Sequence, residues 1–326
     1  MIYATLLLLM GVSNDAEATL KATLAQAELL QPANPRMVDE ALISLAQFLK
    51  QRGRYREAEP LYIRSSELAQ SAEETAWSFL RLGALYHVEL HFDQAEAATR
   101  RAVTLFRTLS GDATLEFAYA TANLAAVLAD QGEYARAEPV LRRALYLVRK
   151  LAPGHTSMLA QIQENLGLVY LRQGDFRNAE ALLRDVLATF EAIDDPAQAC
   201  TLAALAELAI AERRWVEANA WIRRAYELTV ATRGERHPWL VGILHLKGLV
   251  EAQAGNPLQA AADMKQSIDL LESLAGPDSS TLPVVLIDYA VLLRHAGRKR
   301  EAKTALERAR YIERNFSRPL RKFTNR

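Results

Sequence analysis

The fold is decided by the stretch Asn165-Leu166-Gly167-Leu168-Val169-Tyr170 and, after three intervening residues, Gly174-Asp175-Phe176-Arg177-Asn178-Ala179-Glu180. The small residue Gly167 stands seven positions before Gly174, and Ala179 stands five positions after it. Apolar residues on both sides of Gly174 recur at helical spacing. A glycine between such segments favours the left-handed backbone that ends a helix. The stretch therefore predicts a helix, a tight turn and a second helix that packs back against the first.

The same pattern occurs eight times along the chain. The residues at the turn are Gly11, Gly53, Leu90, Gly132, Gly174, Arg213, Gly255 and Gly297. The small residues seven positions before the turn are Ala4, Ala46, Gly83, Ala125, Gly167, Ala206, Gly248 and Ala290. The alanines five positions after it are Ala16, Ala58, Ala95, Ala137, Ala179, Ala218, Ala260 and Ala302. These alanines follow one another at intervals of 37 to 42 residues, a period typical of repeat arrays. Small side chains let two helices approach closely, and a larger residue there costs about 1–3 kcal/mol through overpacking.

This pattern resembles the tetratricopeptide repeat, and its 42-residue form resembles the repeats of kinesin light chains. The resemblance implies an all-α fold, a right-handed α-α superhelix of about eight antiparallel helix pairs. We expect one solenoid over residues 1–316, followed by a basic tail at 317–326. The expected repeats are about 1–31, 36–70, 73–110, 115–152, 156–193, 197–232, 238–274 and 280–316. Leu90 and Arg213 depart from the turn glycine but leave the register intact. The likeness is to the repeat type alone, so a motor-adaptor function does not follow.

Composition agrees with a continuous helical array. Half of the 326 residues are hydrophobic, with only 14 glycines and 11 prolines. Cys200 is the single cysteine, which excludes a disulfide framework or a thiolate metal cluster. Formal charge sums to zero, yet from Arg294 onward twelve Lys or Arg face three Glu. We interpret this basic end as a solvated helix face and tail; binding of an anionic partner is the alternative. Nucleic acid and membrane are not expected partners.

The N-terminal residues 1–10 allow two interpretations. They form either a short first helix of the repeat array or the apolar core of a signal peptide, with Ala16-Glu17-Ala18 as a cleavage site. Gly11 and Ala16 fit the repeat register, and no Lys or Arg precedes the apolar run, so we favour the repeat and a cytoplasmic protein. Export after removal of residues 1–18 is the alternative. An exposed apolar first helix would also favour self-association.

The sequence contains no convincing catalytic or cofactor motif. In His87-Val88-Glu89-Leu90-His91 the glutamate stands one position later than in a zinc-protease helix, and the register places His91 in the turn. Glycine-rich phosphate loops are absent from the sequence, and Cys200 has no histidine near it in sequence to act as a base. We therefore expect no metal, no cofactor, no catalytic residues and no enzymatic activity.

The repeat type indicates where a ligand would bind. In this family the first helix of each pair, helix A, lines the concave side, and the second, helix B, the convex side. Chaperone-binding members clamp a terminal carboxylate with Lys and Asn on helix A; the corresponding positions here lack Lys, so we do not expect that clamp. The groove candidates are Gln47, Trp77, Arg81, Tyr119, Asn123, Asn165, Leu168, His245 and Leu249.

The asparagines and the aromatic residues among these candidates can each be interpreted as ligand-binding or as structural. Asn123 and Asn165 hold equivalent places in adjacent repeats, where two amides can bind an extended peptide backbone or merely cross-link helices. Trp77 and Tyr119 form aromatic walls of a groove or pack between repeats.

We predict a scaffold that binds a peptide or a helix of a partner protein in its concave groove. One alternative is a regulatory or sensor subunit of a signalling or transcription system. The other is an exported repeat protein in an envelope assembly. The fold alone does not distinguish them, because it hosts many functions.

Overall fold

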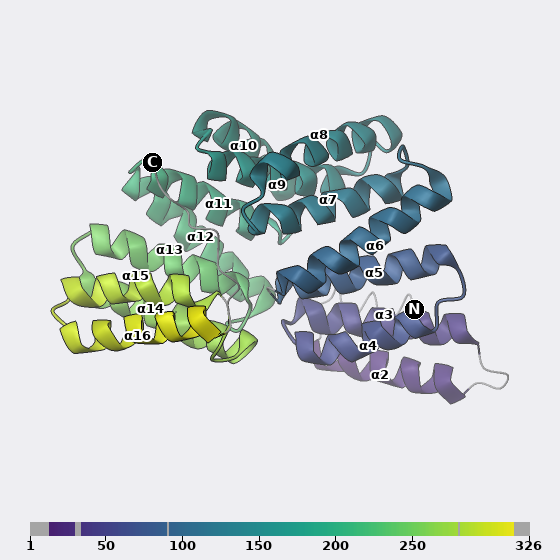
Figure 1. Cartoon of the computed structure of the whole chain (residues 1–326), viewed down its shortest axis with the longest axis horizontal. Coiled ribbons are helices and arrows are strands. Elements are labelled where there is room, and N and C mark those ends of the chain that lie inside the picture. Colours follow the sequence, from purple (N-terminus) through teal and green to yellow (C-terminus); the bar gives the residue numbers. More distant parts are fainter. Residues whose placement is uncertain (1–12, 30–33, 90, 280, 316–326) are drawn as a thin grey trace. The chain divides into compact units, whose positions relative to one another are not determined.

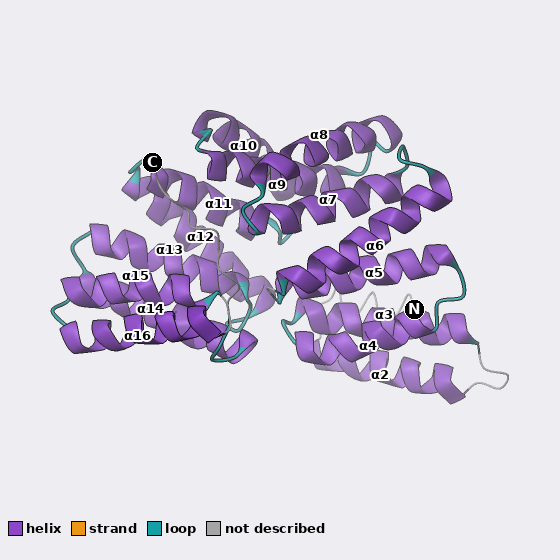
Figure 2. Cartoon of the chain, viewed as in Figure 1, coloured by secondary structure: helices purple, strands orange, loops and turns teal. Residues whose placement is uncertain are grey.

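The computed structural model describes residues 13–29, 34–89, 91–279 and 281–315, and every element within those ranges is a helix (Figures 1 and 2). The chain divides into two compact units, Met1–Gly154 and His155–Arg326. The helices of the first unit are α2 (Ser13–Leu29), α3 (Pro35–Gln51), α4 (Tyr55–Glu67), α5 (Ala72–Val88), α6 (Phe92–Ser110), α7 (Leu115–Asp130) and α8 (Tyr134–Leu151). Those of the second are α9 (Thr156–Gln173), α10 (Phe176–Ala192), α11 (Gln198–Ala211), α12 (Trp215–Arg233), α13 (Trp239–Gln253), α14 (Pro257–Ala275), α15 (Leu282–His295) and α16 (Lys299–Asn315).

Within each unit the helices pack as consecutive pairs. In the first unit α3 packs on α4, α5 on α6 and α7 on α8; in the second, α9 packs on α10, and the later helices pair in the same order. Each helix B also contacts the helix A that follows it within its unit, for example α4 with α5 and α12 with α13. The predicted all-α fold of stacked helix pairs is confirmed. The odd-numbered helices from α3 are the A helices, and α2 and the other even-numbered helices are the B helices.

The small residues lie at the helix contacts. The alanines after the turn are all 0% exposed from Ala58 to Ala302, and Ala16 is 1% exposed. A Cβ added to Gly167 would lie 2.9 Å from side-chain atoms of Leu183, and one added to Gly248 would lie 3.0 Å from the carbonyl oxygen of Ala260. The pairs are therefore packed too closely for a larger residue at these positions.

The turn between helices A and B uses a left-handed residue, as predicted. Gly174 has φ +81°; its N–H donates to the oxygen of Leu171, and the next N–H donates to the oxygen of Tyr170. Arg213 has φ +60° and sits in the same pair of hydrogen bonds, which its own N–H and that of Arg214 donate. An arginine thus adopts the glycine conformation, and the register continues through this repeat.

Regular hydrogen bonds link consecutive repeats at the turns. The glutamate directly after the alanine that follows a turn accepts a hydrogen bond from the turn of the next repeat: Glu17 from Arg54 at 2.5 Å and Glu96 from Gln131 at 3.1 Å. In the second unit Glu180 accepts from Arg214 at 3.2 Å. These repeated glutamates therefore have a structural role.

The N-terminal alternatives fall mostly outside the described residues. This is true of residues 1–10, and of the self-association predicted for them, and the tail at 317–326 also lies outside. Within α2, Ala16 and Leu20 pack in one core cluster with Ala46 and Tyr62, as the repeat interpretation predicts. No helix of the described segments has both the length and the apolar character needed to span a membrane. The single array over residues 1–316 stays a prediction.

Candidate functional site

Helices α5 and α7 bring four of the groove candidates together in the first unit. Trp77 and Tyr119 stand six positions before the small residue of their A helices, and Arg81 and Asn123 stand two before it. The ring centroids of Trp77 and Tyr119 are 6.2 Å apart, and Trp77 also meets Phe106 edge-on at 5.1 Å. All four candidates are only partly buried. The A-helix face of this unit therefore carries two aromatic rings, a guanidinium and an amide.

The Trp77 contacts support both interpretations of the aromatic candidates. The edge-on contact with Phe106 of α6 is packing within the helix pair. The contact with Tyr119 joins neighbouring A helices and leaves each ring partly exposed.

The Asn123 amide is used within its own helix. Its Nδ2 donates to the carbonyl oxygen of Tyr119 at 2.9 Å. Asn165 lies in α9, which belongs to the second unit, and it is also half-buried. That the Asn123 and Asn165 amides both hydrogen-bond the backbone of one bound peptide stays a prediction.

Two cations on the A helices of the first unit are partly desolvated. Burial lowers the pKa of Lys50, and burial lowers the pKa of Arg81 against the opposing effect of Asp39. The Asp39 carboxylate itself accepts a hydrogen bond from Ser65 Oγ at 2.5 Å. Among the residues that the structure describes, neither cation forms a hydrogen bond or a salt bridge. Lys50 was not among the sequence candidates.

The second unit contains a recessed acid that sequence reasoning did not single out. Burial raises the pKa of Glu164 to about 7, even though Thr201 Oγ1 donates to its carboxyl group at 2.5 Å. The adjacent Cys200 thiol has a pKa raised well above its usual value by burial, with Glu164 adding to the shift. A protonated thiol beside a poorly ionised acid is not an activated nucleophile.

The remaining groove candidates differ in how much of each side chain is exposed and in whether it already has a partner within the chain. Gln47 is exposed on α3. Leu168 packs partly against the core cluster around Leu205. His245 Nε2 lies 2.8 Å from Asp288 Oδ2 on the next A helix, and Leu249 is half-buried on the same helix as His245.

The histidines of the stretch 87–91 face different partners. His87 Nε2 lies 2.6 Å from Asp130 Oδ2 on α7, whereas His91 precedes α6, with its ring 3.8 Å from the Glu89 carboxylate. Across the described ranges, no group of three or more His, Cys, Asp or Glu side chains is arranged to hold a metal ion.

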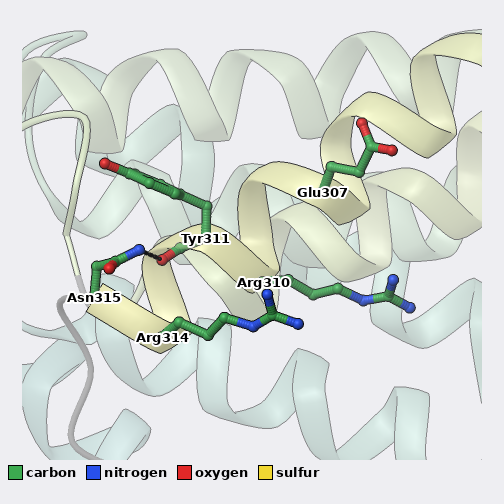
Figure 3. A pocket seen from close by; sticks show the side chains of 5 residues that line it. All are labelled: Glu307, Arg310, Tyr311, Arg314 and Asn315. Carbon is green, nitrogen blue, oxygen red and sulfur yellow. Dashed lines mark hydrogen bonds between the residues drawn. The ribbon is translucent and has the colours of Figure 1, made fainter.

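A shallow hollow of about 430 Å³ lies against the last described helix (Figure 3). Its lining residues are Glu307, Arg310, Tyr311, Arg314 and Asn315. Figure 3 shows these side chains spread along one helix, with the Asn315 amide donating to the Tyr311 carbonyl oxygen at 2.8 Å. All five belong to the solvated outer face of α16.

The fold and these faces define a helical-repeat protein of the tetratricopeptide type. Residues 2–266 match the MalT-like TPR region, and residues 283–308 match the tetratricopeptide repeat. The chain belongs to the MalT-like TPR region family, and the predicted resemblance to tetratricopeptide repeats is confirmed. No curated protein matches the sequence.

Solved structures of two Rap proteins share the fold at low identity. A Rap protein complexed with competence and sporulation factor is 16% identical, covers 96% of this chain and 83% of its own, and has a TM-score of 0.73. The Rap conjugation gene regulator of plasmid pLS20, in complex with the Phr* peptide, is 16% identical over 85% of this chain and 74% of its own, at a TM-score of 0.67. Kinesin light chain TPR-like repeats from Podosopora anserina are 18% identical over 61% of this chain and 95% of their own, at a TM-score of 0.45.

Proposed function

We propose that this chain is a protein-interaction scaffold whose A-helix faces bind a peptide or a helix of a partner protein. The observation that carries the proposal is the group of Trp77, Arg81 and Tyr119 on neighbouring helices of the first unit. Tryptophan, tyrosine and arginine are the residue types enriched at binding hot spots. Packing within the chain covers each of them only in part, so a partner can still bury the rest.

Peptide complexes of proteins with the same fold support this proposal. The Rap protein and the pLS20 regulator are each described with a bound factor or peptide. The proposed role requires no catalysis by this chain. Burial raises the pKa of its one thiol, Cys200, well above the usual value, so this thiol is not an activated nucleophile.

A regulatory subunit is the second candidate function. Its support is the likeness to a conjugation gene regulator, at a TM-score of 0.67. In such a system, the bound peptide would control an effector carried by another protein. The binding face would be the same in both cases.

Selection from a random peptide library, displayed on phage and presented to the immobilised full chain, tests the scaffold proposal. Affinities of the selected peptides are then measured by fluorescence anisotropy for the wild type and for Trp77→Ala and Tyr119→Ala. We expect each variant to weaken binding about tenfold or more, the loss of a hot-spot side chain. Tyr146→Ala on α8 is the matched control, because this tyrosine is 62% exposed on a B helix of the same unit.

Circular dichroism of each variant separates lost binding from lost folding. Peptides that bind all variants equally would show that this face is not the site. A response to Leu249→Ala instead would place the site on the second unit. A library that yields no saturable binder contradicts the proposal.

A further inference from the structure

Three apolar side chains are exposed along one flank of α15. Val284 is 50% exposed, Ile287 39% and Val291 45%. Together with Arg294 they stand at positions i, i+3, i+7 and i+10, so all four lie on one stripe of the helix, the α15 stripe. No other helix of the described segments carries more than two exposed large hydrophobic side chains. Single exposed apolar residues are ordinary, whereas a contiguous stripe indicates an interaction surface.

The same register positions contact the next A helix elsewhere in the chain. Trp77, six positions before the small residue of α5, has its ring 6.2 Å from an aromatic ring of α7. His245, three positions before the small residue of α13, lies 2.8 Å from a carboxylate of α15. Val284 and Ile287 occupy these two places on α15. The α15 stripe is therefore the flank on which α15, the last A helix that the structure describes, has no neighbouring A helix among the described residues.

Helix α16 is not suited to receive a further A helix in the usual way. In α10, Leu187 belongs to one core cluster with Leu202 and Leu205 of the following A helix. Leu187 stands eight positions after the alanine that follows its turn, and the residue at that place on α16 is the exposed Arg310. An A helix packed as α11 is would bury this charge, which is costly without a partner. The partner of the α15 stripe should therefore contact α15 without covering α16.

The two ends of the α15 stripe carry opposite charges. Asp278 is exposed in the turn before α15, and Arg294 is exposed in the last turn of the helix. Val284 and Val291 are seven residues apart, about 10.5 Å along the helix axis. A second α15 in the antiparallel direction sets each of these valines opposite the other one. It also brings the acidic end of one helix beside the basic end of its partner.

We propose that a second copy of this chain binds the α15 stripe, with the two α15 helices packed antiparallel about a two-fold axis close to Ile287. A surface that faces itself across such an axis must be self-complementary, and this stripe is so in its charges and in the spacing of its valines. The interface uses the second unit and is independent of the proposed peptide-binding face on the first. A dimer would present two such faces, which favours partners that carry two binding segments.

Sedimentation velocity of the full chain, from low to high micromolar concentration, tests the interface. One helix flank makes a small interface, so we expect a reversible dimer that dissociates on dilution. Val291→Asp should weaken self-association about tenfold or more, because the dimer would bury its carboxylate without a partner. Val216→Asp on α12 is the matched control, since Val216 is 88% exposed on a B helix of the same unit. This control should associate as the wild type does.

Disulfide formation tests the direction of packing. Val284→Cys and Val291→Cys are made as separate variants in a Cys200→Ser background, because Cys200 is the single cysteine. In the antiparallel dimer position 284 of one copy faces position 291 of the other, whereas the two copies of position 284 are separated by about 10 Å along the axis. A disulfide requires Cα atoms about 4.4–6.8 Å apart. Mild oxidation of the mixed variants should therefore give mixed dimers in excess over random pairing.

Circular dichroism establishes that each variant is folded. The replaced valines are exposed, so the variants at positions 284, 291 and 216 should keep the helicity of the wild type. The peptides selected by display should bind Val291→Asp with wild-type affinity. Loss of self-association with peptide binding retained therefore identifies the α15 stripe as the dimer interface.

Three results would overturn the inference and leave the proposed peptide-binding function untouched. One is a wild type that stays monomeric at high concentration; if Leu320→Asp then dimerises, residues 316–326 are the partner of the stripe. Another is a dimer that persists in Val291→Asp and is lost in Leu7→Asp, which would place self-association on residues 1–10. The third is mixed disulfides no more frequent than random pairing gives.

Discussion

Gly83 lies so close to Thr99 of the paired helix that a Cβ on Gly83 would stand 2.6 Å from Thr99 Cγ2 and 3.2 Å from the Thr99 backbone nitrogen. The backbone contact gives the neighbour little freedom to move aside. Thr99 is also fixed by its hydroxyl, which donates to the Ala95 carbonyl oxygen at 2.7 Å. The small residue before each turn is therefore a packing requirement of the helix pair.

Gly83→Ala should destabilise the first unit by about 1–3 kcal/mol through overpacking. Gly242→Ala is the matched control, because Gly242 lies in helix α13 with nothing within 4 Å of its added Cβ. That substitution should stabilise its helix by about 0.5–1 kcal/mol. Hydrogen exchange of the α5 and α6 amides measures the first effect locally. Equal protection in wild type and Gly83→Ala would contradict the packing argument.

Arg213→Gly should stabilise the chain. Arg213 holds φ +60°, a left-handed conformation that costs an L-residue about 1–2 kcal/mol. Glycine adopts it freely, although its flexible unfolded state offsets part of the gain, so we expect a net increase of about 0.5–1 kcal/mol. Chemical denaturation followed by tryptophan fluorescence reports on this region, because Trp215 starts the next helix. Gly174→Ala should have the opposite sign at the equivalent turn.

The sequence pattern predicted the features that repeat. Turn, small residue and alanine recur at fixed spacing, so one copy such as residues 165–180 is enough to place helices A and B throughout. The proximity of Trp77 and Tyr119 also follows from register, because they occupy the same position on consecutive A helices. Local spacing and helix geometry suffice for these inferences.

Features that depend on which residues meet across repeats could not be predicted in the same way. Glu164 and Thr201 stand at different register positions, so comparison of equivalent places does not pair them. Within a single helix, the hydrogen bond from the Asn123 amide to the Tyr119 carbonyl oxygen depends on the rotamer of Asn123, which the sequence does not specify either. The partial burial of Lys50, which lowers its pKa, depends on how neighbouring helices cover the side chain, and spacing along the sequence does not give that.

The wild-type protein should become less stable as pH rises because Glu164 is buried, and the variant Glu164→Gln should lack this pH dependence. The pKa of this carboxyl is raised from 4.5 to about 7, chiefly by burial. Between these values the unfolded chain releases the proton while the folded chain keeps it, so folding weakens as pH increases. At about 1.4 kcal/mol per pKa unit, the wild type should lose up to about 3 kcal/mol relative to the variant between pH 4.5 and 7.5. Urea denaturation of both proteins across this range measures the difference, and parallel pH profiles would refute it.

His237→Gln should show the opposite trend on the acidic side. His237 is 5% exposed, and burial, followed by the nearby charge of Arg233, lowers its pKa from 6.5 to about 4. Between these values the unfolded chain binds a proton that the folded chain does not, so the histidine makes the protein less stable as pH falls. Relative to the variant, the wild type should lose up to about 3 kcal/mol between pH 7 and pH 4. Glutamine keeps an acceptor for the backbone N–H of Trp239, which in the wild type donates to His237 Nδ1 at 3.3 Å. Urea midpoints that shift equally with pH in both proteins would mean that His237 is protonated as easily in the folded chain as in the unfolded one.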